Sequence, residues 1–250
     1  MPVIDTESIV LKSYDLAEAD RIVVFFARHH GVVRGVAKGI KRLTSRYGSA
    51  FEPFNSVQLT YFQKEDRELV TIQSAEISSS NFVAASDPDV LSAFSYIADL
   101  LLAFAPPNDP NDLVFRMLRA CFETRGLDPE RLPAVRVYFE LWLLKLGGFL
   151  PDWSRCHICR REFHSIERPG IDHAEHLVCA DCHKGRLADP VPQHLLTVFH
   201  NVQKMTPGDF AQCDVDNDAV REVSAVLRRI IESVLDRPLA SAADAAIQSR

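Results

Sequence analysis

Four cysteines in two close pairs constrain this chain more than any other feature of its sequence. They form the pattern Cys156-x-x-Cys159 and Cys179-x-x-Cys182, with nineteen residues between the pairs. Each pair presents two thiolates from one tight turn, and four thiolates complete a tetrahedral shell. The spacing therefore predicts one structural zinc ion, because four protein ligands leave no coordination position for water or substrate. We expect the zinc module to cover about residues 153–187.

Two disulfides or four buried thiols are the alternatives for the same cysteines. The first residues show no basic segment followed by a long apolar run, so we expect a cytosolic location, where disulfides are rare. A zinc ion with four thiolates carries net negative charge, and nearby cations are expected to compensate for it. These cations are Arg155, Arg160, Arg161, Lys184 and Arg186. Cys121 and Cys213 stand alone, and we expect them to be small buried residues.

The segment His173-Ala174-Glu175 before Cys179 imitates part of a zinc deaminase signature. Only three residues separate Glu175 from Cys179, whereas the two parts of that signature open separate helices, so we reject a deaminase. The nearby histidines are expected to be exposed polar residues. The chain also lacks a phosphate-binding loop, a G-x-G-x-x-G motif and a G-x-S-x-G nucleophile motif. The sequence thus predicts a protein that is not an enzyme.

The periodicity of apolar residues changes near residue 80. Before it, short β-branched and aromatic runs predict strands of a small barrel or sheet, of OB or SH3 size. These runs are 9–11, 22–26, 31–36, 57–61 and 69–72, with a polar turn at 64–67. After it, spacing near 3.6 predicts helices at 89–105, 112–124, 134–146, 194–204 and 218–235. We therefore expect two domains, 1–80 and 81–250, and no membrane span, because the apolar runs are too short.

The charges are distributed unevenly along the chain. The net charge is −6, yet the segment from Arg21 to Phe51 contains seven basic residues and no acidic one. Glycines and hydroxyl residues accompany these cations, a mixture that suits a loop lying along phosphates. The residues predicted to bind DNA are Arg21, Arg34, Lys38, Lys41, Arg42 and Arg46. Seven aromatic residues could stack on bases, but most must be core: Phe25, Phe26, Tyr47, Phe51, Phe54, Tyr61 and Phe62.

Several segments resemble a known family. They are Ser8–Tyr14, Glu18–Val23, Gly31–Gly39 and Ser45-Arg46, and the order of the downstream helices fits as well. The chain is similar in these segments to the bacterial DNA repair protein RecO family of recombination mediators. The resemblance implies an N-terminal OB-fold barrel, then a helical domain with a four-cysteine zinc site at Cys156, Cys159, Cys179 and Cys182.

The resemblance also implies a function without nucleotide hydrolysis. Such a protein binds single- and double-stranded DNA and anneals complementary strands. Together with RecR it promotes RecA loading on strands coated by single-stranded-DNA-binding protein, in the cytoplasm and in association with the nucleoid. Two alternatives stay open: a zinc-containing regulator that binds one nucleic-acid sequence, and an adaptor whose helical domain makes all the contacts.

Overall fold

The structure is a computed structural model that describes residues 3–42, 45, 47–63, 68–82, 86–124, 126–164, 167–183, 189–213 and 216–239. The chain divides into two compact units between Glu123 and Thr124. The first compact unit contains the N-terminal strands together with the first two long helices. The domain limits 1–80 and 81–250 remain a prediction. The polar turn expected at 64–67 lies outside the described residues.

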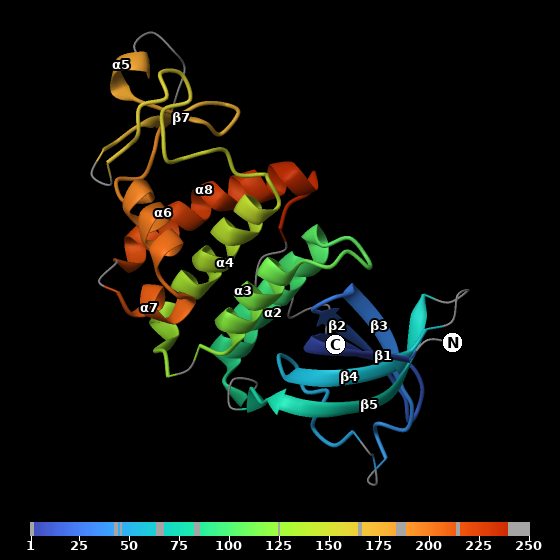
Figure 1. The fold of residues 1–250 in the computed structure, drawn as a ribbon. Coiled ribbons are helices and arrows are strands. Elements are labelled where there is room, and N and C mark those ends of the chain that lie inside the picture. Colours follow the sequence, from blue (N-terminus) through green and yellow to red (C-terminus); the bar gives the residue numbers. More distant parts are fainter. Residues whose placement is uncertain are drawn as a thin grey trace. The chain divides into compact units, whose positions relative to one another are not determined.

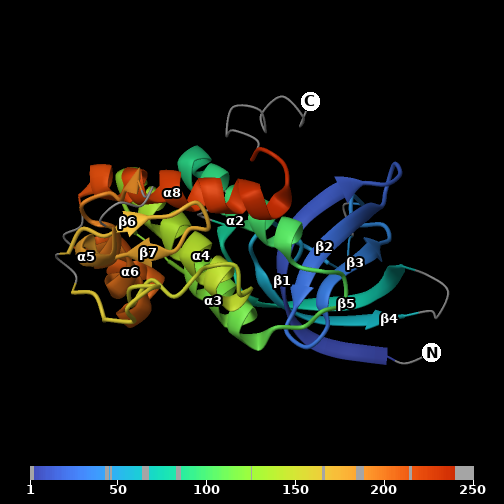
Figure 2. The same ribbon diagram turned by 90° about the horizontal axis from the view of Figure 1, so that it is seen from above.

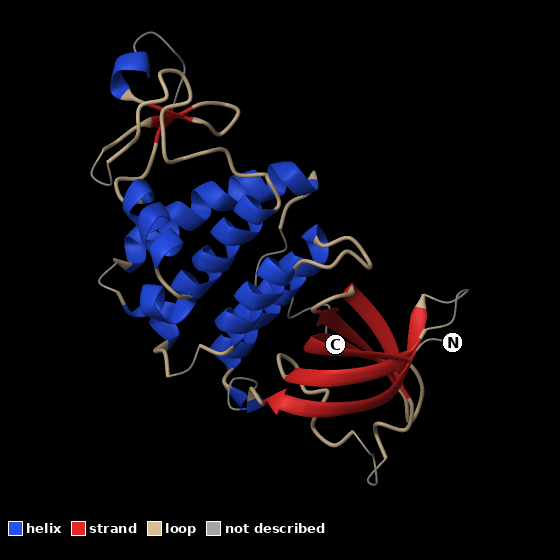
Figure 3. Ribbon diagram, in the orientation of Figure 1, coloured by secondary structure: helices blue, strands red, loops and turns tan. Residues whose placement is uncertain are grey.

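Five strands of the first unit close into a barrel (Figures 1 and 3). Their order around it is β1-β2-β3-β5-β4, and the pairs are antiparallel except β3–β5. This confirms the predicted N-terminal five-stranded barrel of the OB type. The strands are β1 (Val3–Asp15), β2 (Arg21–Ala27), β3 (Gly31–Ala37), β4 (Ser56–Phe62) and β5 (Leu69–Ser79).

Strand β1 is far longer than the three residues predicted for it. Its register with β2 shifts between Val10 and Lys12, which marks a bulge at Leu11. Residues Val3–Ile9 pair with β4, and Ser8–Asp15 pair with β2. The bulge bends one strand so that it serves two neighbours, and the polar residues on its outer face hid this length from the sequence pattern.

The barrel interior contains most of the candidate aromatic residues. Phe25, Tyr47, Phe51 and Tyr61 belong to its core, and the Tyr47 hydroxyl donates to the Ile72 carbonyl at 3.1 Å. Phe26 and Phe54 are buried as well, whereas Phe62 is half-buried. The prediction that most of these rings are core is confirmed.

Helices α2 (Pro88–Phe104) and α3 (Asp112–Phe122) complete the first unit. Each begins with a side-chain cap: Asp87 accepts from the first-turn amides of α2, and Asn111 accepts from an amide of α3. Phe54 lies 5.5 Å from Phe94 of α2 and 4.9 Å from Phe122 of α3, measured between ring centroids. Both helices therefore pack on the barrel through one aromatic cluster.

A charged network fixes α3 to the barrel as well. The Arg28 guanidinium lies 3.0 Å from Glu7 of β1 and 2.6 Å from Asp112 of α3. Glu7 also pairs with Arg119 of α3. Both guanidiniums lie 5.9 Å from the centroid of the buried Phe115 ring. The network joins β1 and the turn after β2 to both ends of one helix.

The second unit consists mainly of helices (Figure 2), and α4 (Leu132–Leu146) is buried on most of its surface. It packs against α6 (Leu195–Lys204), α7 (Pro207–Gln212) and α8 (Asn217–Leu235), and a short 3-10 helix, η1 (Pro129–Arg131), precedes it. The sequence analysis missed α7, which is only six residues long. No helix in the described ranges has the length and apolar character needed to cross a membrane.

The segment between α4 and α6 contains the four cysteines of the predicted zinc site and several short elements. These elements are β6 (Gly170–Ile171), β7 (Leu177–Val178), α5 (Ala180–His183) and β8 (Asp189–Pro190), and the three strands form a small sheet in the order β7-β6-β8. Figure 3 shows this sheet as a second, smaller group of strands. The sequence analysis did not anticipate it, because strands of two residues produce no periodic pattern.

Candidate metal centre and nucleic-acid surface

The four predicted cysteines come together in one cluster. The sulfur atoms of Cys156, Cys159, Cys179 and Cys182 all lie within 4.8 Å of one another. The first pair comes from the loop before β6, Cys179 follows β7, and Cys182 lies in α5. Two knuckles that are distant in sequence thus bring their sulfur atoms together, as the spacing predicts.

The backbone prepares the cluster for thiolate chemistry. Burial raises the pKa of Cys156, but backbone N–H groups of Cys179, Cys159 and Ile158 directed at its sulfur lower the pKa to about 6. The N–H of Cys179 lies 3.4 Å from that sulfur. Likewise, the N–H of Cys182 lowers the pKa of Cys179. A thiolate is the metal-binding form, so this geometry favours a bound cation.

Arg160 shapes the first knuckle. Its φ is +63°, in the left-handed region, and its N–H donates to the Cys156 carbonyl at 2.9 Å. That bond closes the turn and points the chain's amides back at the sulfur. Glycine is the usual residue for this conformation, so Arg160 is held there by the surrounding fold.

Among the cations expected to compensate the charge of the thiolates, Arg161 is the described one that interacts with a cysteine of the cluster, Cys179. It makes a bidentate pair with Glu167 at 2.9 and 2.7 Å, and hydrogen bonds to Glu167 and then Cys179 raise its pKa. Arg155 instead pairs with Asp152 at 3.0 Å. Lys184 and Arg186 lie outside the described residues.

A buried tryptophan seats the cysteine module on the helices of its own unit. Trp153 is fully buried and its Nε1 donates to the Glu175 carbonyl at 2.8 Å. Its ring centroid lies 5.9 Å from that of Phe199 on α6. The thiol cluster contains no histidine, and His157 and His176 stack on each other at 3.8 Å instead. Four soft thiolates in this arrangement fit Zn²⁺ in a closed, structural site.

The predicted DNA-binding cations lie in and around strand β3. Arg21 opens β2, Arg34 lies in the middle of β3, and Lys38, Lys41 and Arg42 follow β3 directly. Arg46 lies outside the described residues. The structure therefore places five of the six predicted residues in one region of the barrel, on adjacent strands and the loop that follows.

Two of these cations share a carboxylate that the sequence analysis did not consider. Asp15, at the end of β1, lies 3.1 Å from Arg21 Nε and 2.8 Å from Lys41 Nζ. The hydrogen bond from Lys41 holds the pKa of Asp15 below its usual value, with Arg21 acting in the same direction against partial desolvation. Asp20 makes a second contact between the same two segments, because its carboxylate accepts a hydrogen bond from the Gly39 N–H at 2.8 Å.

Three other predicted cations differ from Arg21 and Lys41. They are Arg34, Lys38 and Arg42. All three are exposed, and none forms an ion pair with another residue of the described ranges. Their charges face solvent and are the ones available to phosphates. The distinction needed the tertiary structure, since Asp15 lies outside the acid-free segment.

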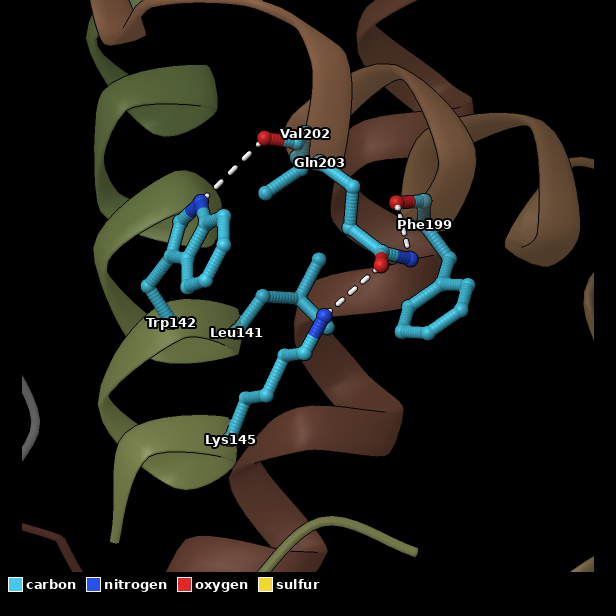
Figure 4. Close-up of a pocket in the computed structure, with 6 residues that line it drawn as sticks. All are labelled: Leu141, Trp142, Lys145, Phe199, Val202 and Gln203. Atoms are coloured by element: carbon cyan, nitrogen blue, oxygen red, sulfur yellow. Dashed lines mark hydrogen bonds between the residues drawn. The ribbon is translucent and has the colours of Figure 1, made fainter. Parts of the chain in front are cut away.

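A small pocket lies between α4 and α6 in the second unit (Figure 4). Its own side chains largely fill it: Trp142 Nε1 donates to the Val202 carbonyl at 3.2 Å, and Lys145 Nζ donates to Gln203 Oε1 at 2.7 Å. Lys145 Nζ also lies 4.9 Å from the Trp142 ring. None of the predicted site residues lines this pocket.

Comparison with known proteins identifies one family along nearly the whole chain. Residues 1–81 match the family model described as recombination protein O N terminal, and residues 85–243 match the one described as recombination protein O C terminal. The DNA repair protein RecO of Koribacter versatilis is 35% identical over 178 residues, which cover 70% of this chain and 71% of that protein. The DNA repair protein RecO of Geobacter metallireducens is 30% identical over 238 residues, 95% of each chain. The chain belongs to the RecO family of DNA repair and recombination proteins.

Proposed function

We propose that this protein is a recombination mediator that binds single- and double-stranded DNA and anneals complementary strands. The observation that carries the proposal is the exposed group Arg34, Lys38 and Arg42 on the barrel of a chain in this family. Cations without carboxylate partners neutralise phosphates and release counterions, which drives sequence-independent binding. Two complementary strands then approach each other with less mutual repulsion.

Membership of the same family supports a wider proposed role. With RecR, the protein promotes RecA loading on strands coated by single-stranded-DNA-binding protein, in the cytoplasm and associated with the nucleoid. It acts without catalysis, as a scaffold for strands and partners. The zinc ion at Cys156, Cys159, Cys179 and Cys182 is structural and joins the two cysteine pairs into one module.

The test is strand annealing with unrelated labelled oligonucleotides, without any nucleotide triphosphate. The variant carries Arg34→Glu, Lys38→Glu and Arg42→Glu, and the matched control carries Arg116→Glu, Lys204→Glu and Arg221→Glu, three exposed cations away from the basic segment. Both triple variants change the net charge equally. We expect annealing by the wild type and the control, for every oligonucleotide pair, and its loss in the first variant.

Other outcomes count against the proposal. Tight binding to one duplex sequence without annealing would identify a sequence-specific regulator instead. Absence of binding at moderate salt would identify an adaptor whose helical unit makes the contacts. Equal loss of annealing in both triple variants would show that total charge, and not the basic segment, governs binding.

A further inference from the structure

Tyr14 is an exposed aromatic residue on the outer face of the barrel. Its exposed fraction is 51%, although tyrosines of this unit such as Tyr47 and Tyr61 are buried. It lies in the second half of β1, beyond the bulge, where β1 pairs with β2. No described residue forms a ring contact with it. The ring surface is therefore open to solvent beside the basic segment.

The strand register places Tyr14 in a row of apolar side chains. Tyr14 pairs with Ile22 of β2, and Ile22 pairs with Val36 of β3. Paired residues point to the same face of a sheet. Ile22 and Val36 are half-buried, so the row continues the open apolar surface across three strands.

The next row on the same face contains the exposed cation Arg34. Lys12 pairs with Val24, and Val24 pairs with Arg34. Adjacent strands are about 4.8 Å apart, so Arg34 lies roughly 10 Å across the face from β1, one pleat away from the Tyr14 row. Lys12 is paired with Asp99, whereas Arg34 is exposed and has no ion pair among the described residues.

The remainder of this outer face is already covered. Phe26 lies four residues after Ile22 in β2 and stacks on Phe115 of α3, with 6.3 Å between the ring centroids. Val24 is buried as well. The opposite face is core, with Val23 and Val33 in the interior cluster. The uncovered part of the outer face is therefore the end that combines an exposed ring with exposed cations.

We infer that Tyr14 is a stacking platform for an unpaired base of single-stranded nucleic acid, with Arg34 neutralising a phosphate of the same strand. The inference rests on the proposed function and names the residue that distinguishes single strands from duplex. An aromatic ring stacks on any base, so it adds affinity without sequence preference. The charge of Arg34, Lys38 and Arg42 selects a polyanion as the occupant of this surface.

The experiment compares Tyr14→Ala, Tyr14→Phe and a control, Leu113→Ala, which removes an exposed apolar side chain from α3. We expect Tyr14→Ala to weaken single-strand binding by about 5- to 150-fold, the range for loss of one stacked base. The salt dependence should stay unchanged, since no phosphate contact is lost. Tyr14→Phe should restore binding, and Leu113→Ala should bind normally. Duplex affinity should be equal in all four proteins, because paired bases are not available for stacking.

A covalent readout gives the position directly. An oligonucleotide carrying 5-iododeoxyuridine, irradiated in complex with the protein, should crosslink to the peptide containing Tyr14, in the wild type and in Tyr14→Phe but not in Tyr14→Ala. If the wild type binds single strands and Tyr14→Ala binds them with the same affinity, this inference is wrong and the proposed function still stands. An equal loss for single strands and duplex leads to the same conclusion. A wild type that binds no DNA overturns both.

Discussion

Lys41 Nζ lies 2.8 Å from Asp15 Oδ2, and this pair joins the end of β1 to the segment that follows β3. The Lys41 N–H also donates to the Ala19 carbonyl at 3.1 Å. Lys41 therefore holds two loops together, whereas Lys38 and Arg42 form no ion pair with a described residue. Neighbouring cations of one sequence motif consequently have different roles.

Lys38→Gln and Arg42→Gln should each reduce the salt dependence of single-strand binding. Each lost phosphate contact lowers the slope of log affinity against log salt by ~0.7. Lys41→Gln should lower the slope less, because Asp15 already offsets its charge. Fluorescence anisotropy titrations at four or more salt concentrations measure the slopes. An equal decrease in all three variants would show that the ion pair to Asp15 opens when DNA binds.

Loss of one zinc ligand should destabilise the second unit. The wild type should contain one zinc ion per chain by elemental analysis. Cys156→Ser should lose it and lower the unfolding free energy on the order of 4 kcal/mol, a decrease in Tm of roughly 8–16 °C. The control is Cys213→Ser, a cysteine outside the cluster. A Cys156→Ser protein with normal Tm but defective DNA binding would show that the metal acts in binding and not in folding.

Gly31→Ala should be far more destabilising than Gly48→Ala. Both glycines have positive φ, +66° and +50°, so alanine is strained at either position. At Gly31 the added Cβ would also lie 2.5 Å from the Asp109 carbonyl oxygen, whereas at Gly48 it meets nothing within 4 Å. We expect about 1 kcal/mol for Gly48→Ala and about 3 kcal/mol or more for Gly31→Ala in urea unfolding. Equal losses would mean that the chain around Asp109 moves aside at little cost.

The acid stability of the first unit should depend on Arg28. Its hydrogen bond holds the pKa of Asp112 below the usual 3.8, with partial desolvation opposing. A lowered pKa stabilises the fold above the unfolded-state value, and the contribution is lost as pH falls through the folded-state value. Arg28→Gln should therefore raise the pKa of Asp112 toward 3.8 and move acid unfolding to higher pH. Carbon-13 NMR of the side-chain carboxylates between pH 2 and pH 6 measures this, with Arg221→Gln as control.

The sequence predicted those features that depend on local spacing. Cysteine pairs predicted the thiol cluster because ligand spacing within a turn is a local property. The limits predicted for α3 and α4 from spacing near 3.6 lie within two residues of the observed ones, because helical periodicity is a local property. The aromatic residues of the barrel were recognisable as core because strands of a small barrel must fill its interior.

Features that depend on the path of the chain were not predictable in this way. The bulge in β1 decides that Asp15 lies beside Arg21 and Lys41, and no local pattern encodes it. The network of Glu7, Arg28 and Arg119 joins residues more than a hundred positions apart. Tyr14 belongs to a motif that the sequence analysis quoted, yet its exposure follows only from the register. Tyr14 lies between Ser13 and Asp15, so no alternation of polar and apolar residues indicated its outward direction.

The closure of the barrel depends on its shortest ladder. Strands β3 and β5 pair in parallel over three residue pairs, Arg34–Leu69, Gly35–Val70 and Val36–Thr71, whereas the antiparallel ladders have seven pairs each. Local opening in native proteins begins where few hydrogen bonds must break. Amide hydrogens of this ladder should therefore exchange with solvent deuterium before those of the other ladders. Since Arg34 lies in it, a bound strand would slow that exchange, and the slowing would report binding from the backbone itself.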